Sequence, residues 1–194
     1  MKVNGLILAA GNSSRLGQPK QLLKYQGRTL LADIEAKLLA CCDQVYVVLG
    51  YQPELFRAQI NTAQVINNPN WRLGMGSSLA CGAQVAGQQV DGLLIALSDQ
   101  PLITAQHYQS LVKQFNQTPD EIVATSYQDQ CGVPVIFPHA YCNELSQINT
   151  ESGAQSVLQK YPDQVNKIEC LTADFDVDTT EDSRMLNDID TSTS

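Results

Sequence analysis

Three short, mostly apolar runs, at positions 3–9, 45–49 and 93–97, constrain the fold of this chain most strongly. Each run ends at a glycine or a polar loop, and helical spacing follows the first, where Leu30, Ile34 and Leu38 recur at every fourth position. Strands that are apolar on both faces are typical of parallel sheets covered by helices on each side. We therefore predict an α/β protein with three layers, α/β/α, around a mostly parallel sheet of about seven strands.

The alternation of strands and helices continues along the rest of the chain. Strands are expected at 64–66, 122–125, 133–137 and 175–177, and helices at 53–60, 77–85, 104–115, 139–146, 153–161 and 180–186. A length of 194 residues corresponds to about one domain. We expect a single domain over residues 1–187 and a disordered tail over residues 188–194.

The composition argues against several classes of protein. No apolar run approaches the 18 residues that suggest a membrane span, and a net charge of −8 argues against nucleic acid as a general partner. The six cysteines form no Cys-x-x-Cys pair and are accompanied by only two histidines, so a zinc site is not expected. We predict reduced thiols in a cytoplasmic protein.

The charges are unevenly distributed along the chain. Residues 1–72 hold eight basic and four acidic residues, whereas residues 73–194 hold four basic and sixteen acidic ones. This asymmetry fits an anion site in the first part that faces metal-binding carboxylates of the second, or simply an acidic surface and tail. Because ligands of parallel sheets bind at the carboxyl ends of the strands, the loops after Ala9, Leu97 and Val177 are the candidate site.

The loop after Ala9 has the composition of a phosphate cradle. Gly11 allows the backbone to approach a ligand, and Arg15 and Lys20 add two positive charges. The loop contains neither G-x-x-x-x-G-K-[ST] nor G-x-G-x-x-G. A triphosphate site is one interpretation, and an ordinary strand-to-helix turn with two solvated cations is the other.

The other two loops supply carboxylates. Asp99 follows a buried strand and could hold Mg²⁺ against substrate phosphates. Asp176 and Asp178 alternate with apolar residues, so that in a strand both would point to one face and offer a second metal carboxylate. The alternatives are a turn before Pro101 and a helix start at Thr180.

A fourth segment, residues 71–79, is expected to open a helix after a pair of glycines. The hydroxyl groups of Ser77 and Ser78 could meet a ribose, a base or a phosphate there. Either serine could instead be the N-cap of this helix.

Taken together, these segments resemble a known family. The motif Leu-Ala-Ala-Gly at 8–11, continued by Arg15 and Lys20, is similar to the signature loop of nucleotidyltransferases with the nucleotide-diphospho-sugar transferase fold, which is Rossmann-like. The similarity extends in order through 19–23, 27–31, 74–82, 99–101, 132–135 and 176–179. Among MobA-like nucleotidyltransferases it is closest to the molybdenum cofactor cytidylyltransferases, in which Leu-Ala-Ala-Gly accompanies cytidine and Leu-Ala-Gly-Gly accompanies guanosine. Ala10 therefore implies CTP.

The resemblance implies a Mg²⁺-dependent transfer of CMP from CTP to the terminal phosphate of a molybdopterin-type cofactor, with release of pyrophosphate. It implies catalytic roles for Arg15, Lys20 and Asp99, and Mg²⁺ bound by Asp99 and Asp178. Gln100 and Gly132 are expected to face the phosphorylated pterin acceptor, and a molybdoenzyme could receive the product. The implied nucleotide site comprises Leu8, Ala9, Ala10, Gly11, Arg15, Lys20, Ser77 and Ser78.

The chain departs from the family pattern in its acceptor half. The usual Gly-Asp-x-Gly-Ala-Arg is replaced at 150–155, where Glu151 and Gln155 stand for the acid and the arginine, and Val133 replaces a residue that is usually polar. Three alternatives therefore remain: a guanylyltransferase that uses GTP, an NAD(P)-linked reductase, and a non-catalytic relative that handles the cofactor.

Overall fold

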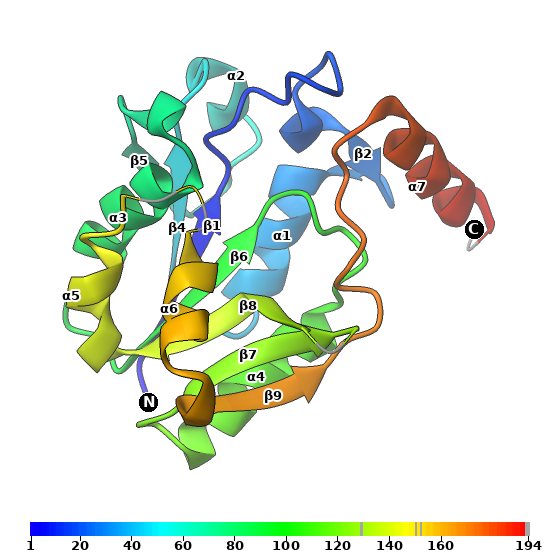
Figure 1. Ribbon diagram of the computed structural model, residues 1–194. Coiled ribbons are helices and arrows are strands. Elements are labelled where there is room, and N and C mark those ends of the chain that lie inside the picture. The colour runs from blue at the N-terminus through cyan, green and yellow to red at the C-terminus, as the bar shows by residue number, and fades with distance from the viewer. Residues whose placement is uncertain (129, 150, 152, 193–194) are drawn as a thin grey trace.

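A seven-stranded sheet forms the centre of the computed structural model, which describes residues 1–192 except 129, 150 and 152. The strand order is β5-β4-β1-β6-β8-β7-β9 (Figure 1). This arrangement confirms the expected α/β class and the mostly parallel sheet. The strands are β1 (Val3–Leu8), β4 (Gln44–Leu49), β5 (Gln64–Asn67), β6 (Gly92–Leu97), β7 (Ile122–Tyr127), β8 (Gln130–Pro138) and β9 (Val165–Glu169).

Strand direction divides the sheet into two parts. The first part, β5-β4-β1-β6, is parallel throughout, and all six residues of β1 are buried, which explains their apolar run. In the second part, β8 is antiparallel to both β6 and β7, while β7 and β9 pair in parallel. The carboxyl ends of β1 and β6 therefore lie side by side at one edge of the sheet.

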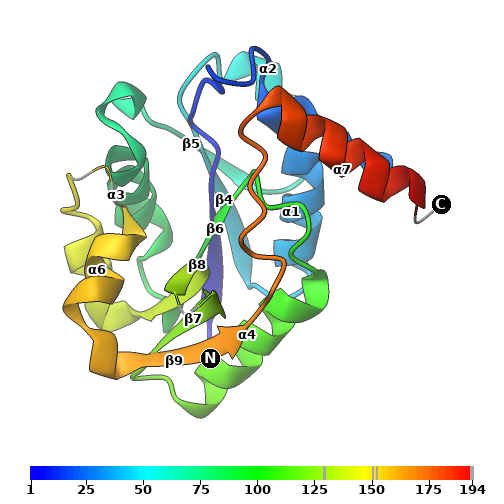
Figure 2. The same ribbon diagram turned by 45° about the vertical axis from the view of Figure 1, so that its right-hand side comes forward.

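Helices cover both faces of the sheet (Figure 2). On one face α3, α5 and α6 contribute buried residues such as Leu79 and Leu158, and on the other α1 and α4 contribute Leu38 and Phe115. The α-helices are α1 (Leu30–Leu39), α2 (Glu54–Arg57), α3 (Met75–Ala86), α4 (Ala105–Gln117), α5 (Cys142–Leu145), α6 (Ala154–Lys160) and α7 (Thr180–Ser192). The short 3₁₀ helices are η1 (Lys20–Leu22), η2 (Trp71–Leu73), η3 (His139–Tyr141) and η4 (Pro162–Gln164).

A small hairpin and the C-terminal helix form a separate cluster at the edge of the molecule. The hairpin consists of β2 (Lys24–Tyr25) and β3 (Arg28–Thr29), and α7 lies beside it (Figure 1). Tyr25 and Leu186 are buried in this cluster, and Ile189 packs against it. Within the expected tail, residues 188–192 belong to α7, whereas residues 193–194 lie outside the described residues.

Two further sequence expectations can be compared with the structure. The strand expected at 175–177 is wrong, since this segment has no regular secondary structure and the last strand is β9. All six cysteines are free thiols. Across the described residues, no helix combines the length and the apolar character that crossing a membrane requires.

Candidate functional site

A cleft of about 320 Å³ lies at the carboxyl ends of β1 and β6, where the parallel sheet predicts a ligand site. Its walls come from the loop after β1, the loop after β6, η2 and the start of α3. The lining residues are Leu8, Ala9, Ala10, Gly11, Asn12, Lys20, Gln21, Trp71, Arg72, Gly74, Met75, Ser78, Leu97, Ser98 and Asp99. The predicted residues Leu8 to Gly11, Lys20, Ser78 and Asp99 thus share one cavity.

The loop after β1 is shaped from beneath by a buried glutamine. The Nε2 amide of Gln21 donates hydrogen bonds to the carbonyl oxygens of Ala9 and Gly11, each at 3.0 Å. At the other end of the loop, the backbone N–H of Lys20 donates to Ser13 Oγ at 3.1 Å. These contacts fold the loop back on itself and bring Lys20 to the cleft. Sequence reasoning missed Gln21 as a functional residue, because its role depends on contacts ten and twelve positions away.

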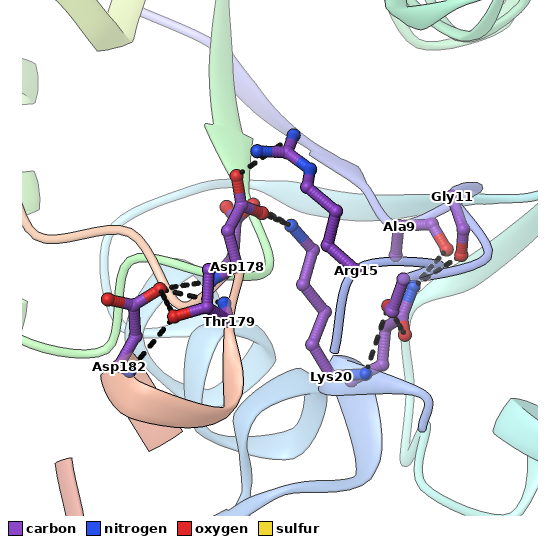
Figure 3. A network of polar contacts seen from close by, with 10 residues as sticks. Ala9, Gly11, Arg15, Lys20, Asp178, Thr179 and Asp182 are labelled. Carbon is purple, nitrogen blue, oxygen red and sulfur yellow. Dashed lines mark hydrogen bonds and ion pairs between the residues drawn. The ribbon is translucent and has the colours of Figure 1, made fainter. Parts of the chain in front are cut away.

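Lys20 is the centre of the charged end of the cleft. Its ammonium group contacts Asp99 Oδ2 and lies 2.7 Å from Asp178 Oδ1, and the guanidinium of Arg15 lies 3.3 Å from Asp178 Oδ2 (Figure 3). Burial alone would lower the pKa of Lys20, but the charge of Asp99 and the hydrogen bonds to both carboxylates outweigh it and raise the pKa. Lys20 therefore stays protonated throughout the physiological range.

The four predicted charged residues differ in exposure. The side chains of Lys20 and Asp99 are 16% and 14% exposed, whereas those of Asp178 and Arg15 are 37% and 76% exposed. Lys20 and Asp99 are held in the interior of the site. The side chain of Arg15 is largely exposed and does not line the cleft, although it pairs with Asp178.

Backbone hydrogen bonds, rather than a strand, hold Asp178 beside Lys20. The N–H of Val177 donates to the carbonyl oxygen of Asp99 at 2.9 Å, which fixes the segment across the end of β6. On the other side, Asp182 Oδ2 accepts hydrogen bonds from the N–H groups of Asp178 and Thr179, at 3.1 and 2.7 Å (Figure 3). Since Asp182 N–H donates in turn to Thr179 Oγ1, the two side chains form a reciprocal cap at the start of α7.

Asp176 is a further carboxylate of this end. The residue is exposed, but partial burial of its carboxyl group raises its pKa to about 6. The charge of Asp99 and, to a smaller extent, the charge of Asp178 also raise this pKa. Sequence reasoning placed Asp176 near the site by its alternation with Asp178 but gave it no separate role.

The oxygen donors at this end fit a divalent cation. Asp99 Oδ1 is buried and has no hydrogen-bond partner among the described residues, and Asp178 lies on the other side of Lys20. Mg²⁺ commonly takes one or two carboxylates and keeps several of its waters. The described residues contain no cluster of three or more His, Cys, Asp or Glu that would hold a metal ion without substrate. Asp99 and Asp178 supply the carboxylate oxygens that such an ion could use.

The two predicted serines both lie in α3, and they line different pockets. The helix α3 begins at Met75 with Gly74 as its N-cap, so neither serine is the cap. Asn68 Nδ2 donates to both hydroxyl oxygens, at 3.0 Å for Ser77 and 3.1 Å for Ser78. Ser78 lines the cleft, whereas Ser77 lines a neighbouring pocket on the other side of the chain.

Gln100 and Gly132, the expected acceptor residues, do not line the cleft. Gln100 is buried, its Nε2 donates to the carbonyl oxygen of Ala173 at 3.1 Å, and its Oε1 has no partner among the described residues. Gly132 lies in β8, where an added Cβ would stand 2.9 Å from the hydroxyl oxygen of Tyr127. In the departing segment, Thr150 and Ser152 lie outside the described residues, and Gln155 lines a separate pocket with Lys167.

Part of the lining of the cleft is aromatic, and sequence reasoning gave this part no role of its own. Trp71 packs edge-on against Tyr51, with ring centroids 5.6 Å apart, and the Arg72 guanidinium lies 4.7 Å from the centroid of the indole ring. The only signal was a single tryptophan shortly before a pair of glycines.

Comparison with known proteins agrees with this architecture. Residues 5–165 match the protein family described as MobA-like NTP transferase domain. The chain is 32% identical over 193 residues to the nicotine blue oxidoreductase of Paenarthrobacter nicotinovorans, which covers 92% of this chain and 93% of that protein. It is 30% identical over 105 residues to the molybdenum cofactor cytidylyltransferase of Escherichia coli (strain K12), covering 53% of this chain and 54% of that protein. Among solved structures, a manganese complex of Rv0371C from Mycobacterium tuberculosis is 26% identical, covers 96% of this chain and 98% of that one, and superposes with a TM-score of 0.78.

Proposed function

The chain belongs to the family of MobA-like NTP transferases, and from this premise we propose that it moves CMP from CTP onto the terminal phosphate of a molybdopterin-type cofactor. The observation that carries the proposal is that Lys20 and Asp99 line one cleft with the glycine-containing loop, and that the Lys20 ammonium also pairs with Asp178. The choice of CTP is supported by the motif Leu-Ala-Ala-Gly at 8–11 and by the cytidylyltransferase among the relatives.

The proposed reaction is a nucleotidyl transfer. An oxygen of the acceptor's terminal phosphate attacks the α-phosphorus of CTP and forms a new P–O bond. The bond between the α-phosphorus and the bridging oxygen to the β-phosphate breaks, and pyrophosphate leaves with that electron pair. Because the attacking phosphate is already ionised near neutral pH, the protein has to supply position and charge rather than a strong base.

The residues of the charged end suit this task. Lys20, held protonated by its carboxylate neighbours, places a fixed positive charge where a triphosphate would lie beside Ala10 and Gly11. Arg15, at the exposed rim, adds a second charge that stabilises the leaving pyrophosphate. Ser78 contributes a contact with the nucleoside from the wall of the cleft.

Asp99 and Asp178 are the residues that would hold Mg²⁺. When bound, the ion neutralises phosphate oxygens and makes the α-phosphorus more electrophilic. Gln100 is a positioning residue. Its hydrogen bond to the carbonyl oxygen of Ala173 connects the loop that carries Asp99 to the segment that carries Asp178. A solved structure that is 26% identical to this chain is a complex with manganese, which supports a divalent cation in this chain as well. We further infer a cytoplasmic protein that hands its product to a molybdoenzyme.

The direct test is to incubate the protein with Mg²⁺, a molybdopterin-type acceptor and either CTP, GTP or ATP. Pyrophosphate release and the mass of the product are measured. The expected result is release with CTP and a product heavier than the acceptor by one CMP unit. Preference for GTP would assign the chain to guanylyl transfer, and binding without release would leave a cofactor-handling role.

A second candidate function is oxidoreduction, which the similarity to nicotine blue oxidoreductase over nearly the whole chain favours. A glycine-rich dinucleotide motif of the form G-x-G-x-x-G is absent from the sequence. The absorbance of NADH and NADPH distinguishes this candidate: consumption of either with a flat heteroaromatic acceptor would support it, whereas a constant absorbance together with pyrophosphate release would reject it.

A further inference from the structure

The aromatic end of the cleft contains a tryptophan whose position is fixed on several sides. A Cβ atom at Gly50 would stand only 2.4 Å from Trp71 Cβ, so the absence of a side chain at Gly50 permits this close approach at the end of β4. Tyr51 contacts the indole ring edge-on at an interplanar angle of 70°. Trp71 thus lines the same cleft as Lys20 and Asp99 and contributes a flat aromatic surface to it.

Arg72 lies against Trp71 and supplies hydrogen-bond donors. Its guanidinium lies over the indole ring at 4.7 Å from the centroid, and its side chain is exposed. Throughout the described part of the chain no carboxylate lies within ion-pair distance of Arg72, whereas Lys20 and Arg15 are both paired with carboxylates. A guanidinium presents five N–H donors and no acceptor.

We propose that Trp71 and Arg72 recognise the flat heteroaromatic ring of the substrate and select a ring that carries two adjacent hydrogen-bond acceptors. The inference rests on the proposed function, which places the triphosphate beside Lys20 and leaves the heteroaromatic ring to contact other lining residues of the same cleft, among them Trp71 and Arg72. Trp71 provides a flat apolar surface, and the fork of donors on Arg72 matches a pair of acceptors.

The donor pattern makes the selection specific. Cytosine presents adjacent acceptors at O2 and N3, and guanine presents them at O6 and N7. Adenine places an amino donor next to its N7 acceptor, so a guanidinium meets one acceptor and one repelling donor. Arg72 therefore disfavours ATP. An oxidised pterin ring also carries adjacent acceptors, at O4 and N5, so the ring could belong to either substrate, and the experiment separates these two sources.

The first experiment uses the chain's single tryptophan as a reporter. The fluorescence of Trp71 is followed while CTP, GTP, ATP, a phosphate-free pterin or pyrophosphate is added with Mg²⁺, and binding of each is measured in parallel by calorimetry. We expect CTP to change the fluorescence and pyrophosphate, which has no ring, to leave it unchanged.

Each outcome bears on the inference separately from the proposed function. If only the pterin changes the fluorescence, the ring belongs to the acceptor and the inference stands. If CTP binds by calorimetry but neither CTP nor the pterin changes the fluorescence, the inference is overturned while the nucleotide site remains. If CTP changes the fluorescence but no pyrophosphate is released with any acceptor, the proposed function fails and the ring site stands. If no ring compound affects Trp71, the inference is also overturned.

The second experiment tests Arg72 directly. Because Arg72 is exposed, Arg72→Gln is expected to fold normally and to bind the preferred ring about tenfold more weakly, with its discrimination against ATP largely lost. Arg72→Lys keeps the charge without the planar fork and should not restore discrimination. Arg57→Gln is the matched control, since Arg57 pairs with Glu54 on α2 outside the cleft. Unchanged discrimination in Arg72→Gln would overturn the role of Arg72.

Discussion

The two ends of the cleft carry their charges in different ways. At one end Lys20 contacts two carboxylates and Arg15 contacts one, so both cations are matched within the chain. At the other end Arg72 lies over Trp71, with no carboxylate of the described chain beside it. The first end is organised before any ligand arrives, which is what electrostatic catalysis requires. At the second end, the N–H donors of Arg72 remain available to a ligand. The residues proposed for the reaction and those proposed for ring recognition can therefore be changed separately.

The largest expected loss of turnover follows from a change at Asp99. Asp99→Asn removes the buried carboxylate charge and should lower turnover by about 10³-fold, while the remaining contact between Lys20 and Asp178 supports the fold. Pyrophosphate release at saturating Mg²⁺ measures the effect, and circular dichroism checks the fold. Asp120→Asn changes an exposed carboxylate elsewhere and serves as the control. A turnover within tenfold of wild type would remove Asp99 from the reaction centre.

Lys20 should give the next largest effect. Lys20→Met keeps much of the side-chain volume but removes the fixed charge, and turnover should fall by about 10²-fold. Lys160→Met is the matched control, because the Lys160 ammonium pairs with Glu144 at 2.8 Å outside the cleft. The same assay compares the two variants. An equal loss in both variants, or none in Lys20→Met, would contradict the account.

Gln21 tests the shape of the loop rather than its charge. Gln21→Leu removes both hydrogen bonds to the carbonyl oxygens of Ala9 and Gly11, and the shifted loop should lower kcat/KM for CTP by about tenfold. Steady-state kinetics with CTP as the varied substrate measures this change. Gln18→Leu alters an exposed glutamine of the same loop and should leave the kinetics unchanged. A result in which both variants behave alike would mean that Gln21 does not position the loop.

The smallest effect concerns the cap that holds Asp178. Hydrogen bonds from the Thr179 side chain and from the backbone of Thr179 and Asp178 lower the pKa of Asp182. A carboxyl whose pKa is lowered on folding contributes stability above its unfolded value, near 4, and loses it as the pH falls through the folded value. Asp182→Asn should therefore cost about 1 kcal/mol at pH 7 and progressively less on acidification.

Urea denaturation of Asp182→Asn and wild type at several pH values measures this difference. Asp120→Asn again serves as the control, because its carboxylate caps no helix. A destabilisation by Asp182→Asn that stays constant down to strongly acidic pH would show that the carboxylate charge is not what holds the cap.

Much of the first half of the molecule was predictable from the sequence. The apolar runs of β1 and β6 identify buried parallel strands, and the rule that ligands lie at their carboxyl ends places Lys20 and Asp99 in one cleft. The helical spacing of α1 and its cap at Thr29, whose Oγ1 accepts from Ala32 N–H, are also local features. Local patterns suffice where strand, loop and helix follow one another directly.

The remaining features depend on contacts between distant parts of the chain. Asp178 is held by a backbone hydrogen bond between Val177 and Asp99, which no period-two pattern can show, and this explains the wrongly expected strand. The antiparallel direction of β8 follows from its pairing with both β6 and β7. Trp71 acquires its role through a close approach to Gly50, twenty-one positions earlier.

We expect the metal-bound triphosphate to bind beside Lys20 and Asp99, with Asp178 next to them. Calorimetric titration of CTP, with and without Mg²⁺, into wild type and Asp99→Asn measures this binding. Mg²⁺ should strengthen CTP binding to wild type, and Asp99→Asn should lose that strengthening. If Mg²⁺ strengthened binding equally in the two proteins, Asp99 would not hold the metal.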